Sequence, residues 1–363
     1  MKRQRVVIAM SGGVDSSVAA ALLINQGYDV VGVMLRLWSE PGSHAHNRCC
    51  TPDSMSIARR IAHKLGIPFY AIDAQDDFYR TVVKQFFEGY GSGVTPNPCL
   101  VCNQLIRWDF LLKRARMMDA DYLATGHYAR LRQTDQGLIQ LLRAADQSKD
   151  QSYVLHTLNQ DQLKHTIFPL GDYTKIQVRQ LAREYSQPVA DRLDSQDLCF
   201  LAGENYRQFL SRNRPELVKS GPIYTTAGEK LGSHHGLAFY TIGQRRGLGI
   251  NSRVPLYVIE KEMHRNAVIV GTREQLTKSS FITGPAHWIS GEYPSESDKL
   301  YVQIRYNSRE TRARTTPREG GGLNVILEEP LAGITPGQAV VFYREDICLG
   351  GATISNAQRR EIR

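Results

Sequence analysis

The 363-residue chain lacks any run of eighteen apolar residues, roughly the length that a helix needs to cross a bilayer. Its start is basic, but only five apolar residues precede Ser11, too few for a secretory signal. Since the six cysteines are not accompanied by an export signal, a framework of structural disulfides is not expected. These absences predict a cytoplasmic protein with no membrane contact, whose cysteines serve metal, redox or nucleophilic chemistry.

Internal repeats and low-complexity segments are also missing from the sequence. At this length one compact core is not enough, and two or three domains are expected. Lysine and arginine total 45 against 36 acidic residues, a net charge of +9. Such an excess suggests a polyanionic partner such as nucleic acid, although a solvated basic surface would also account for it.

The most informative segment is Ser11-Gly12-Gly13-Val14-Asp15-Ser16-Ser17, which directly follows the apolar residues 6–10. A helical pattern comes next, so a strand–loop–helix unit is predicted. The two glycines let backbone N–H groups turn toward one point, and the following helix adds the positive end of its dipole. The segment therefore predicts a pyrophosphate cradle, the alternative being an ordinary glycine-rich turn. It is not a Walker loop, because no Gly-Lys-Ser/Thr follows at the required spacing.

Strand and helix patterns alternate through the first 130 residues. We predict strands at residues 6–10, 30–35, 69–73 and 122–125, and helices that include 54–65 and 105–118. This alternation is typical of an α/β fold with a doubly wound parallel sheet, whose ligands bind at the carboxyl ends of the strands. The cradle, Leu35 and Thr125-Gly126-His127 all lie at such ends, so we expect them to form one site.

From about Gly221 the pattern changes to short β runs separated by glycine and proline. These runs cover residues 240–242, 256–260, 267–270, 301–305, 324–327 and 339–343, and Gly320-Gly321-Gly322 is predicted to be a hairpin loop. Such spacing predicts small β domains, including a barrel. We expect a catalytic domain at 1–212, a small central β-rich domain at 213–278 and a C-terminal β-barrel at 279–363.

Cysteines provide the second chemical signal. Cys99-Leu100-Val101-Cys102 follows a proline-rich approach, and a helix predicted from Asn103 places Cys102 near a helix N-terminus, where the pKa of a thiol falls. Cys199 lies farther along the chain, whereas Cys49, Cys50 and Cys348 are expected to be packed or incidental. A sulfur nucleophile beside an adenylating site has a clear use, since an adenylated oxygen is a good leaving group.

Taken together, these motifs resemble those of a known family. Ser11–Ser17 is similar to the SGGxDS signature of ATP pyrophosphatases (the PP-loop), and the whole chain resembles the MnmA-type tRNA 2-thiouridylases. The segments that carry the resemblance are 11–18, 95–103, 125–130, 149–153, 194–200, 235–250 and 335–343 with 348–351. The resemblance implies that ATP adenylates O2 of the wobble uridine in the anticodon loop of tRNA. Pyrophosphate leaves, and sulfur then attacks C2, giving 2-thiouridine and AMP.

The resemblance also implies the site residues. ATP, with Mg²⁺ bridging its phosphates, would be held by Ala9, Met10, Ser11, Gly12, Gly13, Val14, Asp15, Ser16, Leu35 and Gly126. The target base would be splayed into a pocket lined by Asn97, Pro98 and Cys99. Further tRNA contacts would come from His127, Lys149, Asp150, Gln151, Arg305, Tyr306 and Gln338.

Physical alternatives stand beside the predicted tRNA contacts. His127 can equally be a packed histidine after a strand, and 149–151 a polar surface turn. Arg305, Arg309, Arg312 and Arg314 lie on one hairpin-like segment. That segment would grip tRNA or simply be a solvated β face.

The source of sulfur stays open. Many members of the family carry Asp where this chain has Cys99. In one reading Cys199 carries a persulfide from a sulfur-donor protein, and Cys102 closes a transient disulfide with it. In another, Cys99, Cys102 and Cys199 ligate three irons of a [4Fe–4S] cluster, whose fourth iron presents free sulfide. A zinc site lacks an obvious fourth ligand.

Two other functions compete with this reading. A PP-loop amide or amidino ligase would adenylate a small molecule for attack by nitrogen, and it needs no paired cysteines. A non-catalytic basic RNA-binding protein would retain only a vestigial nucleotide site. The intact Ser11–Ser17 segment argues against the second, and the cysteines argue against the first.

Overall fold

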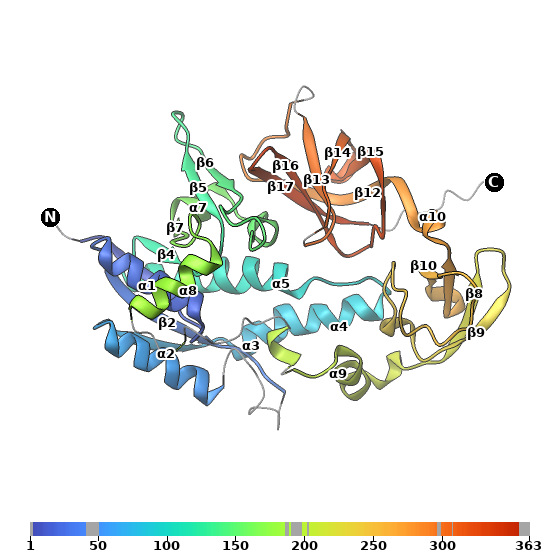
Figure 1. Ribbon diagram of the computed structural model, residues 1–363, viewed down its shortest axis with the longest axis horizontal. Helices are drawn as coiled ribbons and strands as arrows, with labels where there is room; N and C mark the ends of the chain where they lie inside the picture. Colours follow the sequence, from blue (N-terminus) through green and yellow to red (C-terminus); the bar gives the residue numbers. More distant parts are fainter. Residues whose placement is uncertain are drawn as a thin grey trace.

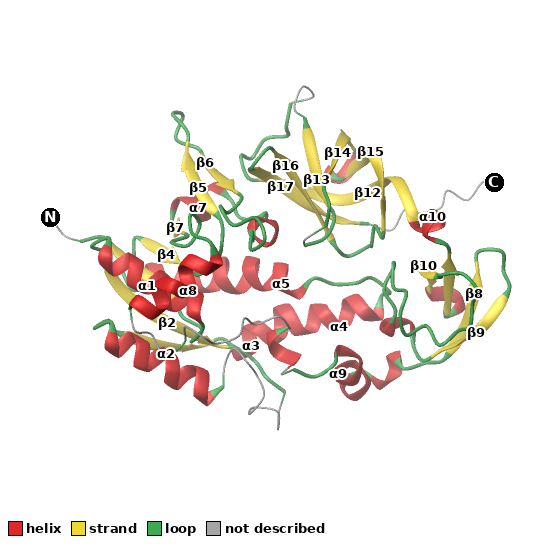
Figure 2. Ribbon diagram, in the orientation of Figure 1, coloured by secondary structure: helices red, strands yellow, loops and turns green. Residues whose placement is uncertain are grey.

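The computed structural model describes residues 3–40, 51–185, 189, 198–201, 203–295, 299–306 and 308–355. Figure 1 shows the N-terminal α/β part at one end, a small β part at the other, and a barrel above the helices between them. Colouring by secondary structure separates the helix-rich N-terminal half from the strand-rich C-terminal half (Figure 2). No helix within the described ranges is both long enough and apolar enough to span a membrane.

In the described residues the N-terminal sheet has five parallel strands, in the order β3-β2-β1-β4-β7. Val6, Val7 and Ile8 are fully buried, because helices cover both faces of the sheet. This confirms the doubly wound fold class, and the four predicted strands agree with the structure to within a residue at each end. The strands are β1 (Arg5–Ala9), β2 (Asp29–Arg36), β3 (Phe69–Asp73), β4 (Tyr122–Ala124) and β7 (Thr166–Ile167).

Two sets of helices flank this sheet. One face is covered by α1 (Val14–Asn25), α2 (Pro52–Lys64) and α8 (Lys175–Glu184), which share an apolar core with β1. Trp108, Leu111 and Leu112 pack against the other face. They belong to a helix formed by α5 (Pro98–Val101), η2 (Cys102–Leu111) and α6 (Leu112–Met117). The smaller helices are α3 (Gln75–Phe78), η1 (Tyr79–Val83), α4 (Lys84–Gly91), η3 (Ser152–Leu155) and α7 (Gln160–Lys164).

An aromatic core joins the N-terminal part to the central β sheet. Phe86, Phe200 and Phe209 pack with Val258 and Val268 of that sheet. The sheet order is β10-β11-β8-β9, and it follows η4 (Cys199–Leu201), α9 (Tyr206–Asn213) and η5 (Pro215–Leu217). Its elements are β8 (Gly221–Thr225), β9 (Lys230–His234), η6 (Leu237–Phe239), β10 (Tyr257–Glu262), η7 (Met263–Arg265), β11 (Ala267–Gly271) and α10 (Arg273–Leu276).

The strand predicted at 240–242 is wrong. These residues follow η6 and enter a turn in which the N–H of Gly243 donates to the carbonyl of Val258 at 2.8 Å. Tyr240 is buried because its ring packs in the aromatic core. The apolar pattern at 240–242 therefore comes from this burial and not from pairing with another strand. β8 and β9 were not predicted, since their sequences GPIYT and KLGSH carry glycine, proline and polar residues.

Six strands of the described residues close into the C-terminal barrel, because β12 pairs with both β15 and β17. Val302, Val325, Val340 and Phe342 fill its interior. η8 (Glu319–Gly321) joins β14 to β15, which confirms the predicted hairpin loop. The barrel strands are β12 (Thr277–Trp288), β13 (Leu300–Gln303), β14 (Thr311–Pro317), β15 (Leu323–Ala332), β16 (Ala339–Arg344) and β17 (Ile347–Ile354).

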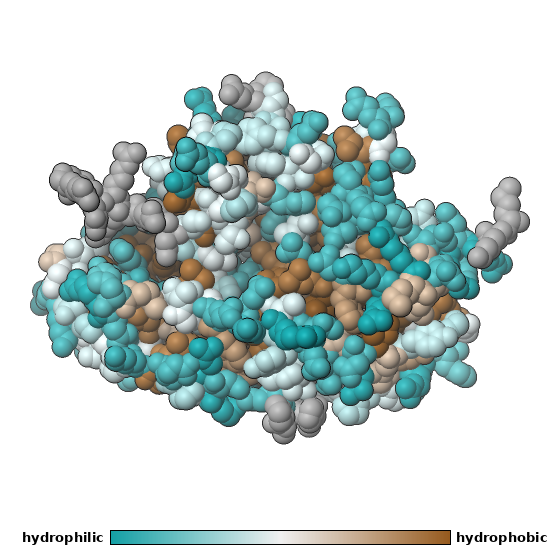
Figure 3. Space-filling view, turned by 180° about the vertical axis from the view of Figure 1, so that it is seen from behind, coloured by the Kyte–Doolittle hydropathy of each residue, from teal (hydrophilic) through white to brown (hydrophobic). Residues whose placement is uncertain are grey.

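A hairpin from the N-terminal part extends the barrel sheet. β5 (Arg130–Gln133) pairs with β6 (Ile139–Leu142), and β6 pairs antiparallel with β17, placing Leu142 opposite Ile347. The N-terminal part and the barrel therefore share a sheet. Seen from behind, hydrophilic residues cover most of the molecule, and apolar ones show mainly toward the middle of that face (Figure 3).

Candidate active site

The glycine loop lies between β1 and α1, at the carboxyl edge of the parallel sheet. Gly12 has φ +70°, and a Cβ there would lie 2.6 Å from the carbonyl oxygen of Ser54, so only glycine fits without strain. The Oγ atoms of Ser16 and Ser17 both donate to the carbonyl of Gly13, at 3.2 and 2.8 Å. The loop is thus closed by its own hydroxyls, at the N-terminus of a twelve-residue helix, a position suited to an anion.

The other predicted nucleotide positions gather at the same edge. Gly126 follows β4, and a Cβ there would lie 2.9 Å from the backbone nitrogen of Ser16 and 3.0 Å from the carbonyl carbon of Asp15. Leu35 lies near the end of β2, opposite Ile72 of β3. Since β2, β1 and β4 are neighbours, the structure brings the loop, Leu35 and Gly126 together at one edge of the sheet.

Asp15 has two partners that sequence reasoning missed. Lys175, the first residue of α8, places Nζ 2.7 and 2.8 Å from the two carboxylate oxygens of Asp15. The hydroxyl of Tyr128 donates to Oδ1 of Asp15 at 2.7 Å. The capping box of Thr174 and Gln177 marks a helix start in the sequence, but nothing there connects its lysine to a loop 160 positions earlier.

The cradle fits ATP with Mg²⁺. It offers backbone donors at a helix N-terminus, one buried lysine and one carboxylate. Mg²⁺ prefers oxygen ligands and is often held by one or two carboxylates together with substrate phosphates. Asp15 is the acidic residue of the loop, so it would hold the ion while Lys175 neutralises phosphate charge.

The helix after the proline-rich loop begins earlier than predicted. Asn97 caps it, its Oδ1 accepting from the N–H of Leu100 at 3.4 Å, and Pro98 occupies the first helical position. The predicted start at Asn103 is wrong, because Asn and Pro together favour a helix start. Cys99 therefore lies exposed in the first turn, and Cys102 lies one turn farther on and is partly buried. The helix dipole acts most strongly on Cys99.

Cys102 and Cys199 approach the same aromatic core. Both pack, partly buried, against the cluster that contains Phe86, Phe200 and Phe209. Within the described part of the chain, no three or more His, Cys, Asp or Glu side chains are grouped so that they could hold a metal ion. The [4Fe–4S] ligand set of Cys99, Cys102 and Cys199 stays a prediction. Residues 194–197 of the Cys199 motif, and Cys49 and Cys50, lie outside the described residues.

The barrel holds the loop before Cys99. Nε2 of Gln338 donates to the carbonyls of Thr95 and Pro96 at 2.8 and 3.3 Å, and the N–H of Thr95 donates to the carbonyl of Pro336 at 3.0 Å. The amide of Gln338, predicted to contact tRNA, is thus engaged in shaping the predicted base pocket. Its tRNA contact stays a prediction.

His127 and Arg305 also have partners within the protein. His127 is buried, with Nδ1 2.7 Å from Oγ1 of Thr125, and its pKa lies well below the usual value because of burial and the nearby Arg107. Nη2 of Arg305 donates to the carbonyls of Ile242 and Gly333 at 2.9 and 2.6 Å. His127 therefore has the packed environment that was the alternative to a tRNA contact. Arg305 links the barrel to the central part. Tyr306, by contrast, is 43% exposed. The side chains of Arg309, Arg312 and Arg314 are exposed as well.

Within the predicted tRNA-contact segment 149–151, one side chain is partly exposed and the other two already have partners within the protein. Lys149 is partly exposed. Asp150 is buried and accepts from the N–H groups of Ala144 and Ser152 at 2.9 and 3.2 Å. Gln151 exchanges two hydrogen bonds with the backbone of Tyr128. A tRNA contact by Asp150 or Gln151 is untested, and both side chains already shape this segment in the described structure.

A glycine loop at the edge of a parallel sheet, with an aspartate–lysine pair and two appended β parts, defines a class of nucleotide-binding α/β proteins. Family models match the chain along nearly its whole length. They are described as the tRNA methyl transferase HUP domain at residues 4–203, the tRNA methyl transferase PRC-barrel domain at 207–272 and the aminomethyltransferase beta-barrel domain at 278–354.

Curated relatives are more specific. A protein of Natranaerobius thermophilus named tRNA-specific 2-thiouridylase MnmA is 44% identical over 99% of this chain and 100% of its own length. A protein of the same name from Moorella thermoacetica is 45% identical, covering 96% of this chain and 99% of its own. The chain belongs to the tRNA-specific 2-thiouridylase MnmA family.

Among solved structures, a 4-thiouridine synthetase in complex with RNA and ATP matches at a TM-score of 0.36 and 16% identity, over 59% of this chain and 51% of that one. A likeness this low carries no functional information.

Proposed function

We propose that this protein is an ATP-dependent tRNA uridine 2-sulfurtransferase that converts the wobble uridine of tRNA to 2-thiouridine. The observation that carries the proposal is the Asp15–Lys175 pair at the glycine loop, at the edge of a sheet whose loops also include Gly126. Membership of the 2-thiouridylase family supports the choice of tRNA as substrate. The proposal keeps 1–212, 213–278 and 279–363 as its three domains and the cytoplasm as its location.

The first step is adenylation. O2 of the uridine attacks the α-phosphorus of ATP, the bond from that phosphorus to the bridging oxygen breaks, and pyrophosphate leaves. The loop N–H groups and Lys175 bind the phosphates, and Asp15 would hold Mg²⁺, which would supply positive charge beside them. Preorganised donors of this kind stabilise the charge that develops on the leaving group.

The second step is sulfur transfer. In the persulfide route, the terminal sulfur of a Cys199 persulfide attacks C2, and the C2–O2 bond breaks to release AMP. The thiolate of Cys102 then attacks Sγ of Cys199, leaving sulfur on the base and a Cys102–Cys199 disulfide, which a cellular thiol reductant must reduce. Both cysteines pack against one aromatic core, which supports their working together. The persulfide itself is delivered by a sulfur-donor protein.

A [4Fe–4S] route would need Cys99, Cys102 and Cys199 to act as one ligand set. Cys99 distinguishes the two routes, since it is needed as a ligand but not for the persulfide chemistry. Anaerobic purification, reconstitution with iron and sulfide, and an absorption spectrum of wild type and Cys99→Ala would separate them.

The function itself is tested by incubating unmodified tRNA with the protein, ATP, Mg²⁺ and a sulfur source, either a persulfide donor or sulfide. Nucleosides from the digested tRNA are analysed for 2-thiouridine, and pyrophosphate is measured in parallel. Formation of both, dependent on tRNA, is expected. AMP formation that requires a small molecule but no tRNA would favour the amide or amidino ligase. A failure to release pyrophosphate with any tRNA would favour a non-catalytic RNA-binding protein.

A further inference from the structure

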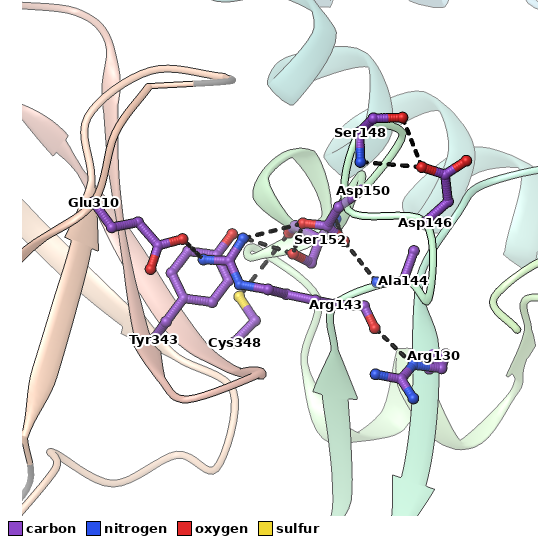
Figure 4. Close-up of polar contacts among 10 residues, drawn as sticks. All are labelled: Arg130, Arg143, Ala144, Asp146, Ser148, Asp150, Ser152, Glu310, Tyr343 and Cys348. Carbon is purple, nitrogen blue, oxygen red and sulfur yellow. Dashed lines mark hydrogen bonds and ion pairs between the residues drawn. The ribbon is translucent and has the colours of Figure 1, made fainter. Parts of the chain in front are cut away.

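Arg143 lies where the N-terminal part meets the barrel. It directly follows β6, and its N–H donates to the carbonyl of Asp346 in the barrel at 2.8 Å. Its guanidinium stacks on the ring of Tyr343 from β16, 3.6 Å from the ring centroid, and its side chain is only 15% exposed (Figure 4). A stacked and largely buried guanidinium is held in one place and has a fixed orientation.

The guanidinium joins two carboxylates from different parts of the protein. Nη1 donates to Oδ2 of Asp150 at 3.3 Å, and Nη2 forms an ion pair with Oε1 of Glu310 just before β14. Asp150 is 7% exposed, and burial raises the pKa of Glu310 while Arg143 opposes that rise. Removing the guanidinium would leave two carboxylates facing each other with no cation between them, so the guanidinium fixes their separation.

Asp150 belongs to segment 146–151, both ends of which reach the residues that hold Asp15. At one end, Oδ2 of Asp146 accepts from the N–H of Lys175 at 2.9 Å. At the other, the N–H of Gln151 donates to the carbonyl of Tyr128 at 2.8 Å, and Oε1 of Gln151 accepts from the N–H of Tyr128 at 2.9 Å. Segment 146–151 therefore contacts both partners of Asp15.

Tyr153, two residues after this segment, contacts the second predicted tRNA element, 305–306. The rings of Tyr153 and Tyr306 lie 6.2 Å apart, and a polar cavity of about 510 Å³ opens between the two elements. Arg143, Asp150 and Glu310 line it, with Gln147, Gln303 and Ser308. Arg143 thus lies between Asp150 of the predicted contact segment 149–151 and the connection from β13 to β14, which carries Tyr306 and Glu310.

We propose that Arg143 is a positioning residue for tRNA-dependent adenylation: it fixes segment 146–151 between the barrel and the Asp15–Lys175 pair. tRNA that docks on the segment thereby acts on the residues that bind ATP phosphates. The inference rests on the proposed function. Because the segment is held at the barrel by Arg143 and at the cradle by Lys175 and Tyr128, a shift at one side is transmitted to the other.

The test compares pyrophosphate release with and without tRNA in four proteins and one control variant. These are wild type, Arg143→Gln, Arg143→Lys and Glu310→Gln. Arg265→Gln is the matched control, since Arg265 also pairs with a carboxylate (Glu262, 2.9 Å) and lies over a tyrosine ring (Tyr224, 5.3 Å), but in the central part. ATP affinity without tRNA and the melting temperature are measured for each protein.

For Arg143→Gln we expect unchanged ATP affinity without tRNA, together with an increase of about tenfold in the tRNA concentration at half-maximal rate and a smaller stimulation by tRNA. Arg143→Lys should keep more of the response to tRNA than Arg143→Gln does. Lysine keeps the positive charge but lacks the planar guanidinium that pairs with both carboxylates. Glu310→Gln should also raise the tRNA concentration at half-maximal rate and lower the stimulation by tRNA, but by less. Arg265→Gln should match wild type.

The proposal is overturned if folded Arg143→Gln and Glu310→Gln keep the wild-type response to tRNA. It is equally overturned if Arg143→Gln loses ATP affinity and melting temperature in proportion to its tRNA response, since that describes a merely structural role. If wild type forms no 2-thiouridine, the proposed function fails and this inference fails with it. The wild-type reaction therefore separates the two failures.

Discussion

The Nζ atom of Lys175 lies 2.7 and 2.8 Å from the two carboxylate oxygens of Asp15, at the helix N-terminus where the phosphates of ATP are proposed to bind. Lys175 is 9% exposed, so this ion pair is shielded from much of the solvent. A partly buried pair of this kind keeps both charges in place, although its two partners lie far apart in the sequence. When phosphates arrive, the lysine has a second anion to bind and the aspartate can take Mg²⁺.

Lys175→Ala should lower tRNA-dependent pyrophosphate release by at least about a hundredfold, the usual loss for one preorganised charge in a site of this kind. Lys175→Arg should retain part of the rate. Lys84→Ala serves as control, because Lys84 is an exposed lysine that pairs with Glu88 across one helical turn. A Lys175→Ala protein with the wild-type rate would show that the lysine only fills space.

Gly12→Ala should abolish ATP binding, as measured by titration calorimetry, because its Cβ would lie 2.6 Å from the carbonyl oxygen of Ser54. Gly66→Ala is a matched control for backbone strain. Its φ is +68°, against +70° for Gly12, and no atom lies within 4 Å of the added Cβ. It should cost about 1 kcal/mol of stability and leave ATP affinity unchanged. Equal effects of the two substitutions would contradict the steric account.

Cys102→Ala and Cys199→Ala should each abolish 2-thiouridine formation and leave tRNA-dependent pyrophosphate release within about twofold of wild type, since adenylation precedes sulfur transfer. Nucleoside analysis of the tRNA and a pyrophosphate assay measure the two steps separately. Cys348→Ala is the control, because Cys348 is buried in the barrel sheet. Thiolation by either single variant at the wild-type rate would remove that cysteine from the mechanism.

Stability should fall in mild acid. Burial lowers the pKa of His156 to about 4 and that of His127 well below 6.5, so both stay neutral in the folded protein. Below about pH 6.5 the unfolded chain binds protons that the folded protein does not, and the free energy of unfolding falls by about 1.4 kcal/mol per pH unit for each group. For His156 this loss ends near pH 4, where the folded protein also binds its proton.

His156→Gln keeps a donor for the carbonyl of Tyr153, which lies 2.8 Å from Nδ1, and should flatten the pH dependence between pH 6.5 and 4. Urea titrations at several pH values measure the slope. His63→Gln, at an exposed position, should leave it unchanged. A His156→Gln slope equal to that of wild type would mean that this histidine does not contribute.

The sequence alone determined the parallel sheet and the loop at its edge. β-branched runs that are buried on both faces, followed by Gly12-Gly13 and a helix, leave little choice of local structure, and the resemblance identified the family. The start of the helix at Pro98 was also readable from Asn97 and Pro98, but the prediction took the pattern after Cys102 as the start. The segment 240–242 was misassigned because burial of Tyr240 imitates a strand pattern.

Only the tertiary structure decided which distant residues meet. The pairing of β6 with β17, the Lys175–Asp15 pair and the fork of Arg143 on Asp150 and Glu310 each join segments that no local pattern connects. Local propensity acts over a few residues, whereas such contacts depend on how sheets and helices pack. Burial likewise decided the environments of His127 and Arg305, for which the resemblance implied contact with tRNA.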